Sequence, residues 1–388
     1  MTRLAAQDLK YLGPESNFLY QMGKLHRAIA VEAYARTIRS AGPVDWYNVL
    51  MSDAALGKTG ATLSAARHVL RFSASDYPNT FHRSSVVAII SGAREARDMA
   101  RGDYLAAQHT VCEDCSQADA ILARAAISAW LHDPAAGHAT LRLVADAPGT
   151  SAHALAELRT DLAMAEKRWS EAAAEAEVYQ KALVADYPET PTLSEIKAQN
   201  LVAPIEARAL AKAHEFEAAG RVIAVTKGDC VPCVTARGEI AALQGKTVVA
   251  QYWFARAVAL APDIPFADTD WGKMLLREGK FSAAIVKFSR AHKNGPHFAD
   301  PLELWGETLI AKNRSDLAVA KFKEAAQNAP NWGRLHLKWG EALLWSGHRD
   351  EAKRQFAIAS HLFLTPIEKS QLASMEGMSI RKNGVEGK

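Results

Sequence analysis

WGKMLLREGKFSAAIVKFSRAHKNGP, residues 271–296, is the stretch that decides the fold, because its key residues recur at a fixed interval. Its glycine is one of four that stand 34 residues apart: Gly238, Gly272, Gly306 and Gly340. Alanine follows each glycine after twelve residues, and phenylalanine after four more: Ala250, Ala284, Ala318 and Ala352, then Phe254, Phe288, Phe322 and Phe356. Proline ends the first three units, at Pro262, Pro296 and Pro330. A period of this length is typical of a repeat solenoid.

The residue types in these columns predict a pair of antiparallel helices in each unit. Glycine and alanine allow the two helices to approach closely, and each phenylalanine is predicted to fill the space between neighbouring units. Gly279 and its counterpart Asn313 tolerate the left-handed conformation that the turn between the helices requires. The closing proline cannot continue a helix interior. We therefore expect an all-α fold.

The pattern W-G-x₂-L-x₃-G-x₄-A-x₃-F-x₂-A-x₄-P resembles the tetratricopeptide repeat family. The match is specific over residues 231–364, which hold four regular units, and it is weaker upstream. The resemblance implies a right-handed superhelix whose concave face binds a peptide or another protein. It implies a protein-interaction scaffold, and from the residues themselves we expect no catalytic residues, metal or cofactor.

The resemblance also implies which residues line the concave groove, because the family uses fixed positions of each first helix. These positions hold mixed charges and two large aromatic side chains: Phe266, Lys273, Arg277, Glu307, Arg334, Glu341 and Trp345. Such a surface suits a peptide anchored by apolar side chains. The alternative interpretation is that these residues merely face water and bind no partner.

The chain is predicted to have three parts. Residues 1–230 hold divergent helix pairs, residues 231–364 the regular units, and residues 365–388 a short capping helix and a flexible tail. We expect eight or nine pairs altogether. Residues 65–131 and 172–249 share several motifs in the same order, including Asp-Tyr-Pro and Cys-x-x-Cys, and are predicted to be copies of one module.

Two Cys-x-x-Cys motifs lie just before predicted helices: Cys112 with Cys115, and Cys230 with Cys233. Solenoid units contact only their neighbours, so four sulfurs from distant units are not expected to meet at one metal ion. The pairs are predicted to be structural, as caps or small buried side chains. A redox couple or disulfide and a metal site remain alternatives, and a redox-sensing module is the second hypothesis for function.

Composition narrows the classes of function. The 388 residues carry 46 basic and 43 acidic side chains, without a basic run, so no nucleic-acid partner is expected. No apolar stretch has the length of a signal peptide or membrane span, which leads us to expect a cytoplasmic protein. Gly57-Lys58-Thr59 lacks the earlier glycine of a phosphate-binding loop and is predicted to be a turn between helices. No catalytic motif is present, and no enzyme is expected.

Overall fold

The computed structural model describes residues 12–38, 42–77, 83–110, 118–145, 147 and 149–380. In these ranges all regular structure is helical, which confirms the predicted all-α class. The first ten helices are α1 (Leu12–Gln21), α2 (Leu25–Ile38), α3 (Pro43–Ala55), α4 (Thr59–Val69), α5 (Arg83–Arg101), α6 (Tyr104–Thr110), α7 (Ala118–Trp130), α8 (Pro134–Val144), α9 (Ala152–Ala165) and α10 (Trp169–Ala185), with a short 3₁₀ helix at Ala74–Asp76. We call α1–α10 the first coil.

The remaining helices form what we call the second coil. They are α11 (Pro191–Lys197), α12 (Ala203–Lys212), α13 (Phe216–Ala224), α14 (Val231–Leu243), α15 (Thr247–Leu260), α16 (Phe266–Arg277), α17 (Phe281–Asn294), α18 (Ala299–Ala311), α19 (Ser315–Asn328), α20 (Gly333–Trp345), α21 (Arg349–His361) and α22 (Pro366–Ile380). A π-helical segment, Ala198–Val202, joins α11 to α12 into one longer helix. The described helices make ten pairs followed by α22, not eight or nine. The pairs upstream of α14 are unevenly spaced, so their number could not be counted from a period.

Glycine and phenylalanine of the same unit pack directly on each other throughout the regular repeat. A Cβ atom added to Gly272 would lie 2.5 Å from Phe288 Cε1, and one added to Gly340 would lie 2.4 Å from Phe356 Cε1. The phenylalanines are among the most deeply buried side chains of the described residues. Each ring therefore occupies the space that the missing glycine side chain leaves on its own unit's first helix, and it also contacts the next unit.

The terminal helix α22 starts as the sequence predicts. Thr365 Oγ1 lies 2.8 Å from Glu368 Oε2, and the backbone amide of Thr365 donates to the same oxygen at 2.9 Å, so a Thr-x-x-Glu box closes the helix start. Helix α22 packs on α20 and α21 as an eleventh first helix would. It runs to Ile380 and is longer than the expected cap, and residues 381–388 lie outside the described part.

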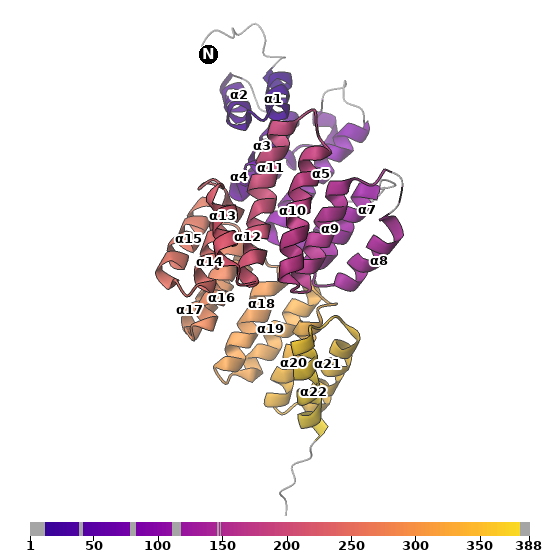
Figure 1. The fold of residues 1–388 in the computed structure, drawn as a ribbon, viewed down its shortest axis with the longest axis vertical. Helices are drawn as coiled ribbons and strands as arrows, with labels where there is room; N and C mark the ends of the chain where they lie inside the picture. Colours follow the sequence, from indigo (N-terminus) through magenta and orange to yellow (C-terminus); the bar gives the residue numbers. More distant parts are fainter. Residues whose placement is uncertain are drawn as a thin grey trace, which may run out of the picture.

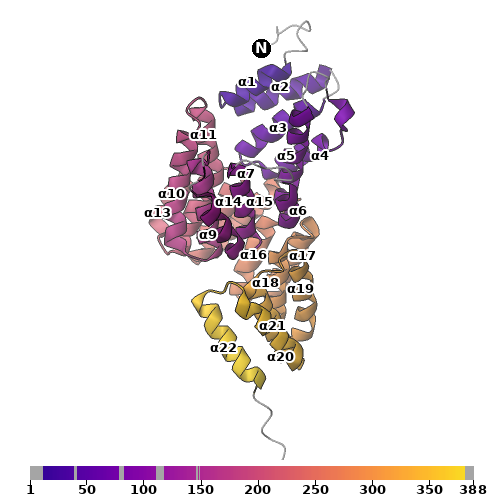
Figure 2. The same ribbon diagram turned by 90° about the vertical axis from the view of Figure 1, so that its right-hand side faces the viewer.

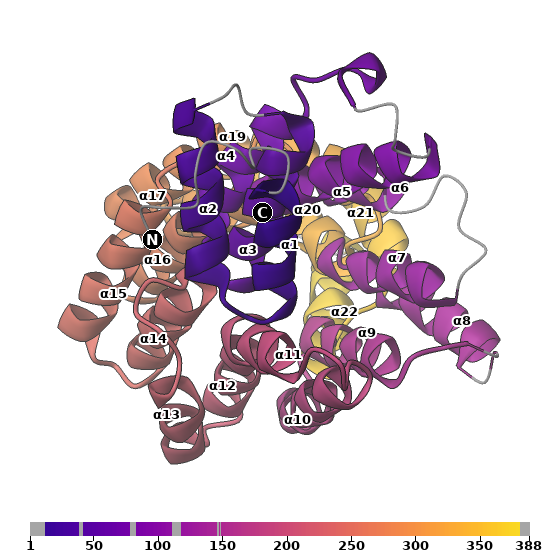
Figure 3. The same ribbon diagram turned by 90° about the horizontal axis from the view of Figure 1, so that it is seen from above.

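The two coils lie against each other, so residues almost 200 positions apart meet. His297 Nδ1 lies 2.6 Å from Asp103 Oδ2 at a separation of 194 residues, and Lys167 Nζ lies 2.7 Å from Glu368 Oε1 at a separation of 201. Viewed along the long axis, the helix pairs follow one another around a common centre (Figure 3). The long molecule has α1 and α2 near one end and α20–α22 near the other (Figures 1 and 2).

The contacts between coils use the turns that join the two helices of each first-coil pair. Each of these turns contains a residue with positive φ: Gly23, Gly57, Gly102, His132 and Lys167. A Cβ atom on Gly57 would lie 2.8 Å from Cys230 Sγ, and one on Gly102 would lie 2.7 Å from Phe298 Cγ. His132 stacks on Trp332 with ring centroids 3.7 Å apart. Turns of the first coil are thus seated on loops between pairs of the second coil.

Candidate functional site

The seven predicted groove residues lie on three first helices: Phe266, Lys273 and Arg277 on α16, Glu307 on α18, and Arg334, Glu341 and Trp345 on α20. Because α16, α18 and α20 are successive first helices, they present these positions in adjacent rows. The structure divides the residues into two groups. One group is engaged by other parts of the chain, and the other carries no ion pair among the described residues.

Arg334 is the centre of the engaged group. Its Nε atom donates to Glu303 Oε1 at 3.1 Å, its Nη1 lies 3.4 Å from Glu368 Oε1, and its Nη2 donates to Glu307. Lys167 of the first coil reaches the same Glu368 oxygen at 2.7 Å. One guanidinium therefore joins α18, α20 and α22, and Lys167 ties the first coil into this cluster.

Burial and charge set the protonation of this cluster. Glu303 is 1% exposed, and its burial, together with the neighbouring Glu307, raises its pKa despite the contact with Arg334. Burial also acts on Glu368, but hydrogen bonds from Lys167 and Thr365 outweigh it and lower the pKa of Glu368 to about 2. The cluster therefore holds an ionised carboxylate at the α22 end and a carboxyl that gains a proton easily in its core.

The second group comprises Lys273, Arg277 and Trp345. No ion pair involving Lys273 or Arg277 is found in the described part of the chain, and Arg277 is exposed. Trp345 exposes 53% of its surface at the end of α20. By contrast, Trp271, Trp305 and Trp339, which stand next to the repeat glycines, pack against the core clusters of their units.

Phe266 and Glu341 also belong to the engaged group. The ring of Phe266 meets that of Phe298 edge-on, with centroids 5.3 Å apart, and it packs against the cluster that contains Leu63 and Val231. Glu341 lies 2.9 Å from Lys338 Nζ, three residues earlier on α20. Phe266 thus contributes to the contact between coils.

A second charged cluster, which the sequence analysis did not single out, lies upstream on the first helices α12, α14 and α16. Arg208 and Lys212 stand four residues apart on α12 and both bind Glu239 of α14, with Lys212 Nζ at 3.1 Å. Arg208 also lies 3.6 Å from Asp270 of α16. The four-residue spacing of Arg208 and Lys212 was a signal of a shared helix face. It was overlooked because this unit lacks the regular repeat.

This upstream cluster faces the interior shared by the two coils. Burial would raise the pKa of Glu239, but Arg208, Lys212 and Lys273 outweigh it and hold the pKa below its ordinary value. Burial lowers the pKa of Lys212 to about 8, and Lys273 and Arg208 act in the same direction. Tyr104 of the first coil is buried beside Asp300, Arg208 and Asp161. Charges from several first helices therefore meet around one first-coil residue.

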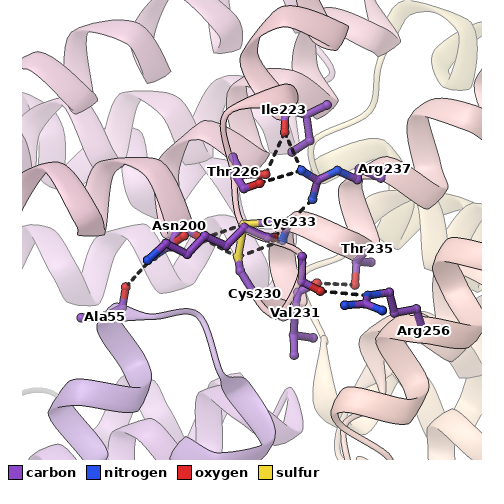
Figure 4. Close-up of a disulfide and its surroundings, with 12 residues drawn as sticks. Ala55, Asn200, Ile223, Thr226, Cys230, Val231, Cys233, Thr235, Arg237 and Arg256 are labelled. Carbon is purple, nitrogen blue, oxygen red and sulfur yellow. Dashed lines mark hydrogen bonds between the residues drawn. A yellow bond between two sulfur atoms is a disulfide. The ribbon is translucent and has the colours of Figure 1, made fainter. Parts of the chain in front are cut away.

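Cys230 and Cys233 form a disulfide at the start of α14 (Figure 4). Cys230 is the N-cap residue, and its Sγ accepts a hydrogen bond from the Cys233 amide at 3.2 Å, so the pair caps the helix as a disulfide, the alternative that the sequence left open. Both side chains are fully buried. Asn200, whose carbonyl lies 3.4 Å from Cys230 Sγ, donates from its side chain to the Ala55 carbonyl of the first coil at 3.2 Å. Cys112 and Cys115 lie outside the described residues.

The disulfide also lies at one of the contacts between a first-coil turn and a second-coil loop. The Val231 amide, next to Cys230, donates to the Gly57 carbonyl at 2.8 Å. Gly57, with φ of +68°, lies in the turn between α3 and α4, so the Gly57-Lys58-Thr59 motif is an inter-helix turn, as predicted.

Several solved structures resemble this chain in part. Tom70 from yeast matches with 12% identity over 96% of both chains and a TM-score of 0.45. MamA of AMB-1 has 22% identity over 42% of this chain and 91% of that chain, with a TM-score of 0.33. PilF from Pseudomonas aeruginosa has 12% identity over 45% and 88%, with a TM-score of 0.38. No family model and no curated protein matches the sequence.

The repeat itself decides the fold. Four helix pairs recur every 34 residues, each with phenylalanine seated on glycine. The chain has a tetratricopeptide repeat fold. The last of its four regular helix pairs, α20 and α21, is followed directly by the single helix α22. Within the described residues of these units, no group of three or more His, Cys, Asp or Glu side chains is placed to hold a metal ion. None of the described helices has both the length and the apolar character that crossing a bilayer requires.

Proposed function

We propose that the chain is a protein-interaction scaffold, without catalysis of its own, that holds a peptide or protein on the first helices of residues 231–364. The observation that carries this proposal is Trp345, an indole that is 53% exposed in a unit whose other tryptophans are packed. An exposed aromatic anchor is typical of binding surfaces. Arg277 supplies positive charge that no ion pair of the described chain neutralises, and Lys273 adds a second cation, whose charge also acts on the buried Glu239.

The structure changes which residues should be substituted to test this groove. Arg334 and Glu307 are poor choices because their loss disturbs the cluster that joins α18, α20 and α22. We expect the triple variant Lys273→Ala, Arg277→Ala, Trp345→Ala to lose partner capture by about tenfold or more, because anchoring residues dominate binding energy. Its helical circular dichroism should stay unchanged. The measurement is affinity capture from native cells, with each captured protein quantified by mass spectrometry.

A matched control is available on the second helices. Tyr252, Lys293 and Arg354 are exposed, and their replacement by alanine removes the same charge and a comparable aromatic ring. This control should capture the partner as the unchanged chain does. Equal capture by the groove variant and the unchanged chain would rule out the groove.

A redox-sensing module is the second candidate, and the position of one disulfide favours it. Cys230–Cys233 lies beside Gly57, at a seat that joins the two coils. A dithiol reductant delivers two electrons and two protons to this bond, giving two thiols and an oxidised reagent. The freed thiols take up more space than the bonded pair, and this would loosen the seat.

We expect reduction to lower the free energy of unfolding by about 2 kcal/mol, the chain-entropy value for so short a ring. The test uses a Cys112→Ser, Cys115→Ser background, so that thiol titration reports Cys230 and Cys233 alone. Amide exchange near Gly57 should accelerate after reduction with dithiothreitol. A further Cys230→Ser, Cys233→Ser variant should not respond to the reagent. Unchanged exchange after complete reduction would assign the disulfide a purely structural role.

A further inference from the structure

The turns of the two coils have equivalent conformations and different surroundings. In the second coil the turns between paired helices also contain residues with positive φ: His214, Gly245, Gly279, Asn313 and Gly347. No atom lies within 4 Å of a Cβ added to Gly245, Gly279 or Gly347. The corresponding positions Gly57 and Gly102 are covered by the second coil. We call the three consecutive turns at Gly245, Gly279 and Asn313 the open turn edge. The turns on either side, at His214 and Gly347, carry exposed carboxylates and are not part of it.

The turns of the first coil are equivalent to this edge, and their contacts with the second coil indicate what kind of surface such turns bind. Lys58 lies 3.9 Å from Asp229, His132 lies 3.1 Å from Asp300, and Lys167 lies 2.7 Å from Glu368. In each case the turn supplies the basic side chain, and the second-coil loop or helix start supplies the carboxylate. In one contact the charges are exchanged, with the carboxylate of Asp103 on the turn and the basic side chain of His297 on the loop. The covered edge is therefore matched mainly to acidic loops.

The open turn edge has the same charge character. Five exposed basic side chains lie along it: Lys246, Arg277, Lys280, Lys312 and Arg314. Only two of them pair with carboxylates of the edge, Lys280 with Glu278 at 2.8 Å and Arg314 with Asp316 at 3.6 Å. Lys312 donates to the hydroxyl of Ser282, which leaves its charge uncompensated. The edge thus carries an excess of positive charge.

We propose that the open turn edge docks a carboxylate-bearing surface of a protein partner, in the way that the first coil docks on the loops of the second. This surface is separate from the proposed groove, and only Arg277 is common to both. A protein is favoured over a nucleic acid because Glu278 and Asp316 stand among the cations. These carboxylates would repel a continuous phosphate backbone, whereas a protein surface can place its own carboxylates between them.

The test reverses charge along the edge without touching the groove. The edge variant is Lys246→Glu, Lys280→Glu, Lys312→Glu. The control variant is Lys293→Glu, Lys323→Glu, Arg354→Glu, which makes the same change in net charge on exposed residues of α17, α19 and α21. Binding of a fluorescent 20-residue polyglutamate peptide is followed by anisotropy at two salt concentrations. An oligonucleotide of equal charge is measured beside it, and self-association by sedimentation velocity.

We expect the edge variant to bind polyglutamate about tenfold more weakly than the unchanged chain, while the control variant keeps most of its affinity. Added salt should weaken the binding that remains in both. Self-association lost only in the edge variant would identify a second copy as the acidic partner. Equal losses in both variants, absence of peptide binding, or tighter binding of the oligonucleotide would each overturn the proposal.

Discussion

Replacing Arg334 with alanine is expected to lower the free energy of unfolding by about 3–5 kcal/mol, the range for removing one partner of a buried ion pair. The side chain of Arg334 is 26% exposed and contacts Glu303, Glu307 and Glu368. Its removal leaves buried carboxylates facing one another without their common cation. Urea unfolding, followed by circular dichroism, measures the loss. Arg354→Ala, on the exposed face of α21, is the control and should change stability by less than about 0.5 kcal/mol.

The Arg334 variant should also depend on pH in a defined direction. In the folded chain the pKa of Glu303 is raised above its ordinary value of 4.5, first by burial and then by Glu307, and loss of Arg334 raises it further. A folded carboxyl with a raised pKa contributes stability that is complete below 4.5 and is lost as pH rises through the folded pKa. The deficit of the variant should therefore be larger at pH 8 than at pH 5. Equal deficits at both pH values would contradict this role for Glu303.

The second large effect is expected at Gly102, where alanine should cost about 2–5 kcal/mol. The left-handed backbone, with φ of +70°, accounts for about 1–2 kcal/mol of this. The collision of Cβ with Phe298, at 2.7 Å, adds about 1–3 kcal/mol. The expected structural result is a looser contact between the coils. Amide exchange around Phe298 should accelerate together with the loss of stability.

Gly279→Ala is the matched control for Gly102→Ala. Gly279 has nearly the same φ, +71°, and lies in the same kind of turn, but no atom stands within 4 Å of its added Cβ. This variant should show the backbone cost alone and leave exchange at Phe298 unchanged. The difference in the free energy of unfolding between the two variants measures what the contact of the Gly102 turn with Phe298 contributes to stability. Equal losses of stability in the two variants would mean that the contact of Gly102 with the second coil contributes little to the stability of the fold.

Much of the fold could be read from the sequence because the information is local. Gly272 and Phe288 stand 16 residues apart in one unit, and their recurrence predicts the helix pair, whereas the packing of the ring on its own unit's glycine was seen only in the structure. Thr365 and Pro366 predict the start of α22 in the same way, and the structure adds the contact of Thr365 with Glu368. The groove residues were placed on the correct helices by the same register. Their role in binding stays a prediction, and so does the duplication of residues 65–131 in 172–249.

The partners of the groove residues could not be predicted in this way. The repeat register places Arg334 on a first helix, but it does not specify that Glu368, one unit later, and Lys167, from the first coil, complete its cluster. The register does separate Trp339, which stands beside Gly340 at a core position, from Trp345 at a groove position, and the structure agrees: Trp339 packs on the core and Trp345 is half exposed.

By itself, then, the sequence determined the helix pairs, their 34-residue period and the left-handed turns, because each depends on residues within one unit. The tertiary structure alone decided that the chain coils back on itself. Small rotations between successive pairs add up over almost 200 residues, and their sum brings Asp103 beside His297. No single unit encodes that sum. For this reason Gly102 and Gly279 look alike in the sequence, while one is covered by Phe298 and the other lies on an open edge.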